Sequence, residues 1–315
     1  MDLTKAKIQS KTNLADFAPW LGQMCRDHPE SQPVVIGGHA SNYWLSRYRQ
    51  SHSPLERWQP KAGRDLDLLI SPKIVGEELM KDPTYEPAAT FLQDLLFFSA
   101  RRFLLRQRLT PISVWFILRA GKINIAHANG RNAIQVDLFA HTLGYHPEYV
   151  RKRAVAASLE GGEFLVADPV QCLWNFLANA GTLNQTQGDE GPRRRIDHER
   201  TVLLYHVCFA YFRDLAEKVR EGDGEAGRQL ASALGDLAHF LKTNIARDLA
   251  PVLGLDWSRI LPPDVRDLDG HGIRGFAAKV TAAGSLSPRR KGLFRRHYPK
   301  PAPTFSPENL SKTNG

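Results

Sequence analysis

The sequence predicts an α+β fold in which a core of strands and helices is followed by a helical region. Short apolar runs bounded by turn residues concentrate before about Val166, helical periodicity dominates from Asp168 to about Leu253, and Pro, Arg and Ser accumulate beyond Gly284. We therefore expect four parts: an N-terminal helix in residues 1–29, an α/β core in 30–166, a helical domain in 167–283, and a basic, Pro-rich, flexible tail in 284–315.

The composition is that of a water-soluble globular protein. The chain has 315 residues, of which 42% are hydrophobic and 24% charged, so two domains are expected and global disorder is not. Cys25, Cys172 and Cys208 have no metal-type spacing and fit a reducing, cytoplasmic environment. We expect no signal peptide and no membrane span, because no apolar run is long enough for either.

Positive charge is concentrated near the C-terminal end of the sequence. The net charge is +9, and eight basic but no acidic residues lie between Gly270 and Pro307. Since Glu308 and Lys312 cancel, residues 1–269 carry only about +1. We call the segment from Gly270 to Pro307 the basic arm.

The first half of the core alternates helical and extended patterns. Gly37-Gly38 follows a short apolar run, and Ser71-Pro72 ends a second one. The expected elements are a helix in 13–28, a strand in 32–36, a helix in 39–48, a polar loop in 50–63 and a strand in 65–70.

The second half of the core begins with a strong helical pattern and continues with strands. Asn129-Gly130 is a hairpin turn signal between two of these strands, and Gly161-Gly162 is a second turn. The expected elements are a helix in 87–109, strands in 112–118, 122–128 and 134–139, and a hairpin in 153–166.

The helical region opens with a recognisable cap. Asp168 precedes Pro169, which is the usual order of an N-cap and a first helical proline. The expected helices cover 168–180, 193–220 and 225–249, with a polar loop in 183–192.

Acidic residues on two of the strands suggest a metal site. Asp65 and Asp67 are two residues apart, so their side chains share a face, with Cα atoms about 6–7 Å apart, while Leu66 and Leu68 face a core. Asp137 has the same kind of apolar neighbours. Three converging carboxylates suit Mg²⁺.

Simpler interpretations of the same residues remain open. Asp65 and Asp67 could be exposed strand positions, but the apolar run that follows favours burial, where a carboxylate pair is costly without a cation. Asp137 could anchor a loop, and Gly37-Gly38 could be a plain tight turn rather than a place where phosphate approaches a helix N-terminus.

These motifs together resemble the DNA polymerase β-type nucleotidyltransferase superfamily. The resemblance covers roughly residues 30–140 and consists of Gly37-Gly38, Asp65-x-Asp67 and a third carboxylate, Asp137. The segment from Asp168 to Asn179 is similar to a helix of small bacterial members, including toxin or abortive-infection proteins. The 26 residues between Gly38 and Asp65 exceed the usual spacing, and we assign the surplus to the loop in 50–63.

The resemblance implies a mixed sheet with flanking helices and transfer of NMP from an NTP to a hydroxyl. Asp65, Asp67 and Asp137 would be the catalytic residues and would hold two Mg²⁺ ions, with Asp137 also helping to deprotonate the acceptor. The implied nucleotide contacts are Gly37, Gly38, Ser41 and Arg64, although Arg64 could equally be solvated.

We favour RNA, such as a tRNA end, as the acceptor, because Phe294, His297 and Tyr298 lie among the arginines of the basic arm. Other interpretations are a protein or small-molecule acceptor, and a catalytically silent binding module for an antitoxin-like partner or for nucleic acid. Candidate nucleic-acid contacts are Arg193, Arg194, Arg289, Arg290, Lys291, Arg295 and Arg296, and the first two could also form a solvated helix face.

Overall fold

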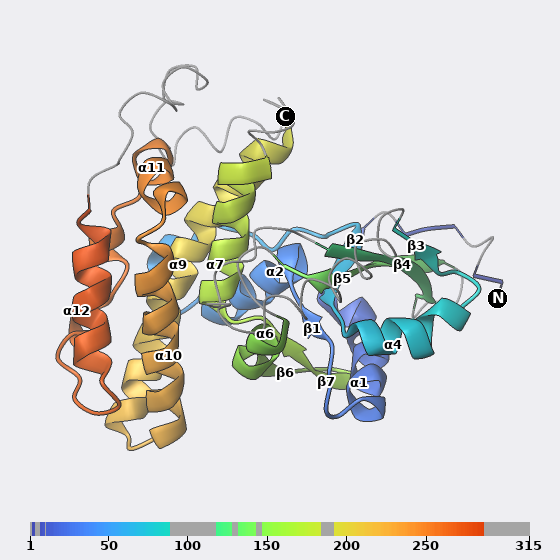
Figure 1. The fold of residues 1–315 in the computed structure, drawn as a ribbon, viewed down its shortest axis with the longest axis horizontal. Coiled ribbons are helices and arrows are strands. Elements are labelled where there is room, and N and C mark those ends of the chain that lie inside the picture. The colour runs from blue at the N-terminus through green and yellow to red at the C-terminus, as the bar shows by residue number, and fades with distance from the viewer. Residues whose placement is uncertain are drawn as a thin grey trace, which may run out of the picture. The chain divides into compact units, whose positions relative to one another are not determined.

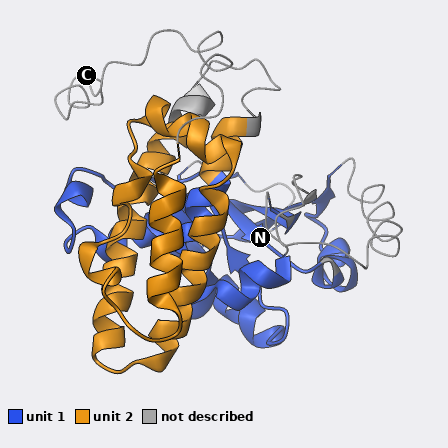
Figure 2. Ribbon diagram, turned by 60° about the vertical axis from the view of Figure 1, so that its left-hand side comes forward, with its two compact units in different colours: residues 1–175 blue, residues 176–315 orange. Residues whose placement is uncertain are grey.

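The computed structural model describes residues 2–3, 7–9, 11–88, 118–127, 132–142, 147–183 and 192–286. The chain divides into two compact units, Met1–Asn175 and Phe176–Gly315 (Figure 2). The first unit carries a mixed sheet with flanking helices, and the second is helical (Figure 1). The predicted α+β fold is therefore confirmed.

Seven strands of the described chain form one sheet in the order β3-β4-β5-β2-β1-β7-β6. The pairs β2·β5 and β1·β7 are parallel and the other neighbours are antiparallel, so the sheet is mixed. The strands are β1 Val34–Val35, β2 Asp65–Leu69, β3 Glu86–Pro87, β4 Leu118–Ala126, β5 Ala133–His141, β6 Val155–Leu159 and β7 Gly162–Val166.

The central strands have one apolar and one polar face. Leu66 and Leu68 of β2 and Val136 and Leu138 of β5 are fully buried, as the alternation in the sequence predicts. On the other face, Asp65, Asp67, Gln135 and Asp137 carry polar side chains, whereas Leu69 of β2 is buried. Strand register therefore decides which polar groups meet on the second face.

Helices of the first unit pack against this sheet. Helix α1 lies so close to β7 that a Cβ atom added to Gly22 would be 2.9 Å from Cα of Gly162. Helix α2 is tied to the end of β7, because the indole Nε1 of Trp44 donates to the Ala167 carbonyl at 2.8 Å. The described helices are η1 Leu14–Phe17, α1 Ala18–Asp27, α2 Gly37–Tyr48, α3 Ser53–Glu56, α4 Pro72–Glu77, η2 Leu79–Lys81 and α6 Pro147–Arg153.

A buried ion pair fixes the start of α7, which spans Pro169–Ala178. Arg153 Nη2 lies 2.7 Å from Asp168 Oδ2, and these side chains are only 7% and 0% exposed. The other Asp168 oxygen accepts from the backbone N–H of Gln171 at 2.9 Å. The predicted Asp168 cap with Pro169 in the first helical position is therefore confirmed.

The second unit packs its helices around apolar side chains. The Trp257 indole donates to the Ala246 carbonyl at 2.9 Å and meets Phe240 edge to face. No helix of the described chain has the length and apolar character needed to cross a bilayer. The elements are η3 Asn179–Leu183, α9 Pro192–Arg220, α10 Gly224–Phe240, α11 Asn244–Leu253, η4 Trp257–Arg259, η5 Pro263–Val265 and α12 Ile273–Gly284.

One expectation for this region is wrong. The single helix predicted over 225–249 is two helices, because α10 ends at Phe240 and Thr243 starts a new one by accepting from the N–H of Ala246 at 3.3 Å. Helix α12 lies almost entirely within the range of the expected helical domain, 167–283, and its Arg274 guanidinium pairs with Asp269 at 3.0 Å.

Several other predictions fall wholly or mostly on residues outside the described part. These are the helix over 87–109, the strand over 112–118, the Asn129-Gly130 turn, the loop over 183–192 and the tail over 284–315. The predicted loop over 50–63 lies within the described part and contains the short helix α3.

Candidate metal centre

The structure brings the three predicted carboxylates together. One oxygen each from Asp65, Asp67 and Asp137 lies within 4.8 Å of the others. The parallel register of β2 and β5 explains this, because it makes Asp67 the direct partner of Asp137 and places Asp65 two residues earlier on the same face. Asp137 is 8% exposed, and the other two are half-buried.

This cluster has the chemistry of a divalent-cation site. Three carboxylates so close together repel one another, and burial of one of them raises the cost of leaving the charges uncompensated. Their oxygens are hard ligands of the kind that Mg²⁺ prefers. The three residues therefore fit the magnesium that the sequence predicts at this position.

The N-terminus of α2 lies directly against the acidic cluster. Gly37 is the first residue of the helix and has φ of +64°, and a Cβ atom added to it would lie 2.0 Å from Oδ2 of Asp67. The N–H of Ile36 donates to the Asp67 carbonyl at 3.0 Å, which holds the two backbones together. Only glycine therefore fits at position 37 without moving the carboxylate.

Gly38 differs from its neighbour because it faces open space. A Cβ atom added to it would have no other atom within 4 Å. The first N–H groups of a helix have no partner within the helix and lie at the positive end of its dipole. The N-terminus of α2 thus lies beside Asp67 with Gly38 on an open side, and a helix N-terminus is suited to anions.

The other two predicted nucleotide contacts, Ser41 and Arg64, differ in burial. Ser41 is fully buried, and its hydroxyl donates to the Gly37 carbonyl at 3.0 Å, so it supports the glycine turn from inside. Arg64 is exposed and directly precedes β2. His39, in the same helix as Ser41, is buried, with Nε2 3.4 Å from the Thr12 hydroxyl.

Two polar residues beside the cluster were missed by the sequence analysis. The side-chain amide of Gln135 donates to Oδ1 of Asp137 at 3.0 Å. Lys122 is the antiparallel register partner of Asp137 on β4. The alternation of residues 122–128 could have indicated Lys122, but the pairing with β5 was needed to place it beside Asp137.

The predicted nucleic-acid contacts cannot be placed beside this centre. Arg193 and Arg194 belong to the first turn of α9, but their side chains lie outside the described part of the chain. Arg289, Arg290, Lys291, Arg295 and Arg296 lie outside it altogether.

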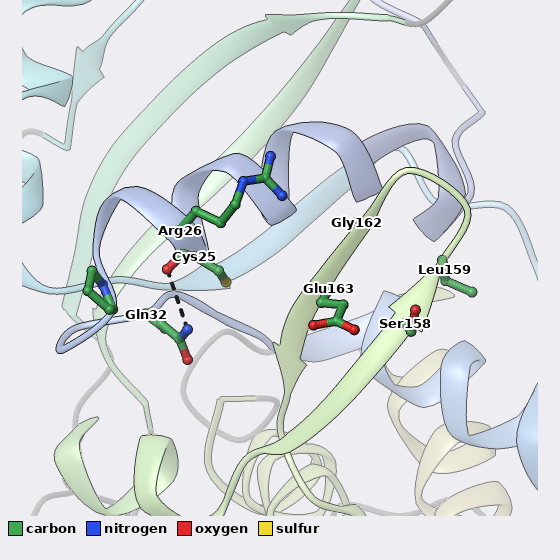
Figure 3. Close-up of a pocket in the computed structure, with 8 residues that line it drawn as sticks. Cys25, Arg26, Gln32, Ser158, Leu159, Gly162 and Glu163 are labelled. Carbon is green, nitrogen blue, oxygen red and sulfur yellow. Dashed lines mark hydrogen bonds between the residues drawn. The ribbon is translucent and has the colours of Figure 1, made fainter.

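A separate hollow of about 460 Å³ lies between α1 and the β6–β7 hairpin (Figure 3). None of the three aspartates lines it. The Gln32 amide donates to the Cys25 carbonyl at 3.4 Å, and burial raises the pKa of the Cys25 thiol, which disfavours the nucleophilic thiolate. The lining residues are Cys25, Arg26, Pro29, Gln32, Ser158, Leu159, Gly162 and Glu163.

Known proteins show little similarity to this chain. No family model and no curated protein matches the sequence. One solved structure that is similar in part is an antigenic nucleotidyltransferase-like protein from Paracoccidioides brasiliensis. The two chains are 14% identical, the match covers 61% of this chain and 75% of the other, and the TM-score is 0.33. A functional assignment therefore depends on the side chains described above.

Proposed function

We propose that the protein is a Mg²⁺-dependent nucleotidyltransferase that moves NMP from an NTP to a hydroxyl acceptor. The observation that carries this proposal is the convergence of Asp65, Asp67 and Asp137 within 4.8 Å, directly beside a glycine-initiated helix. Such a site combines ligands for divalent cations with a place where phosphate oxygens can meet backbone N–H groups.

The two halves of the site have different tasks in this proposal. The β- and γ-phosphates of the NTP lie against Gly37 and Gly38, where the open side of Gly38 leaves room for them. Asp65 and Asp67 would hold the cations. When bound, Mg²⁺ supplies Lewis-acid stabilisation of the charge that develops on the attacking and leaving oxygens.

Asp137 faces the acceptor and receives its proton. The acceptor oxygen forms a bond to the α-phosphorus, the bond from that phosphorus to the bridging oxygen breaks, and pyrophosphate leaves. The acceptor proton passes to Asp137 and then to solvent. The Gln135 amide, which donates to Oδ1 of Asp137, orients the carboxylate for this role.

RNA is the acceptor that we favour. The net charge of +9 and the clustering of positive residues in the basic arm suit phosphate contacts. An antitoxin-like protein partner is a further part of the proposal that the resemblance to toxin nucleotidyltransferases suggests.

The direct test is labelling of total RNA by each α-³²P-labelled NTP in the presence of Mg²⁺. We expect the wild type to label RNA and an Asp65→Asn/Asp67→Asn double variant, which keeps side-chain size, to label none. A single Arg26→Gln variant in the separate hollow is the matched control and should retain activity. Equal labelling by the wild type and the double variant, or no labelling by either, contradicts RNA nucleotidyl transfer.

A further inference from the structure

The polar row on the catalytic face of the sheet continues beyond Asp137. In the strand register, Asp67 is paired with Asp137, Asp137 with Lys122, and Lys122 with Glu86. Directly paired residues on neighbouring strands present their side chains on the same face. One row of side chains therefore runs across β2, β5, β4 and β3, and its one basic member, Lys122, lies next to Asp137.

The burial pattern of β4 agrees with this placement. Lys122 and Asn124 are half-buried, whereas Ile123 and Ile125, which alternate with them along the strand, are buried. The same alternation on β5 puts Gln135 and Asp137 on the polar face. Lys122 therefore belongs to the face that carries the carboxylates and not to the apolar face.

Lys122 is held by an acidic residue on the side away from the centre. Its Nζ lies 2.8 Å from Oε2 of Glu86, and the two side chains are 34% and 62% exposed. Exposed ion pairs contribute little to stability and exchange partners easily. The pair thus keeps the ammonium group near the carboxylates without fixing it permanently to Glu86.

The order of the strands gives the site two sides. The glycine-initiated helix follows β1, which adjoins β2, whereas Lys122 lies on β4, which adjoins β5. A triphosphate bound at Gly38 therefore occupies the β1 side of the carboxylates. The β4 side, next to Asp137, is left for the acceptor.

We propose that Lys122 binds the phosphate next to the attacking hydroxyl of an RNA 3′ end, and that Glu86 competes with the RNA for this lysine. This inference rests on the proposed nucleotidyltransferase function. It adds a residue that recognises the acceptor rather than the NTP. When RNA binds, the ammonium group exchanges the Glu86 carboxylate for a phosphodiester oxygen.

The experiment compares two RNA oligonucleotides that end in a 3′-hydroxyl. One has an ordinary last phosphodiester, and the other has an uncharged methylphosphonate at that linkage. Lys122→Met should raise the KM for the charged oligonucleotide about tenfold, the usual effect of losing one charge-assisted contact. It should leave the KM for the uncharged oligonucleotide and for the NTP unchanged. Lys122→Arg should restore most of the loss.

Glu86→Gln provides a test with the opposite sign. Removal of the competing carboxylate should lower the KM for the charged oligonucleotide, whereas loss of a merely structural ion pair would not. Lys218→Met is the matched control, because Lys218 is 39% exposed and lies 3.4 Å from Asp214 in a comparable pair. This control should leave the preference for the charged oligonucleotide unchanged.

Binding of the two oligonucleotides, measured by fluorescence anisotropy, separates failure of this inference from failure of the proposed function. If Lys122→Met weakens the binding of both oligonucleotides equally, or of neither, Lys122 does not contact the terminal phosphate and the inference is overturned. If the wild type binds neither, the RNA acceptor is also wrong. The nucleotidyltransferase proposal itself is judged separately by Mg²⁺-dependent NTP binding, which Lys122→Met should not change.

Discussion

Replacement of Gly37 by alanine should damage the metal centre through a single added methyl group. The new Cβ atom would lie 2.0 Å from Oδ2 and 2.8 Å from Cγ of Asp67, so the carboxylate must move. The backbone there has φ of +64°, a conformation that alanine adopts only with strain. Both effects act on the same carboxylate that is proposed to hold a cation.

The expected size of the effect follows from these two contributions. Left-handed strain costs about 1–2 kcal/mol for a residue other than glycine, and displacement of the carboxylate adds to it. We therefore expect Gly37→Ala to lower the free energy of unfolding by about 1–3 kcal/mol. Mg²⁺ affinity should fall by at least about tenfold, because one of three ligands leaves its position.

Gly38→Ala is the matched control, because a Cβ atom there has no other atom within 4 Å. Alanine is the better helix former by up to about 1 kcal/mol, so stability should stay equal or rise. Mg²⁺ affinity should not change, but NTP affinity should fall if phosphates approach this glycine. Urea unfolding and isothermal titration with Mg²⁺ measure these quantities. Equal behaviour of the two alanine variants would refute the reasoning.

Three further changes test other parts of the structure. Gln135→Leu removes the amide that donates to Asp137. Calorimetry should then show Mg²⁺ affinity reduced about tenfold, and unchanged affinity would mean that Gln135 does not support the metal centre. Arg153→Met leaves Asp168 buried without its cation, so urea unfolding should show that the free energy of unfolding falls by about 3–5 kcal/mol. A decrease below about 1 kcal/mol would contradict burial of the pair. Hydrogen bonds from the Ser258 hydroxyl and N–H hold the pKa of Asp256 below its ordinary value. The ionised carboxylate therefore stabilises the folded protein above about pH 4, and this contribution is lost as the pH falls through the lowered pKa. Ser258→Ala should therefore make the thermal midpoint less sensitive to pH between about 5 and about 2, and an unchanged pH dependence would argue against the hydrogen bond.

Local sequence patterns predicted the elements that carry the centre. Alternation around Asp65 and Asp67 placed both on one face of a strand, and the apolar neighbours of Asp137 did the same for the third carboxylate. The Asp168-Pro169 pair predicted the start of α7 because capping depends on neighbours within a few residues. Such features are encoded locally, so they can be predicted without knowledge of the tertiary structure.

Features that depend on strand pairing could not be predicted in the same way. The distance between Asp67 and Asp137 depends on a parallel register between segments far apart in the chain. Gln135 and Lys122 look like ordinary exposed strand residues until that register is known. The aspartates were found only because three acidic residues in this order form a motif.

The error in the helical region has a different cause. Apolar periodicity continues through residues 225–249, and the break before Thr243 is marked only by a capping threonine. The helix at Ile273–Gly284 was not predicted as a separate element, although its buried Ile273, Ala277 and Val280 have helical spacing.

The most direct test of the metal centre is a crystal structure of the protein soaked with Mn²⁺ and a non-hydrolysable NTP analogue. We predict an anomalous peak at the Mn²⁺ edge within bonding distance of oxygens from Asp65, Asp67 and Asp137, with the triphosphate against Gly37 and Gly38. A peak that Asp137 does not share with the other two, or a triphosphate bound away from the N-terminus of α2, would contradict it.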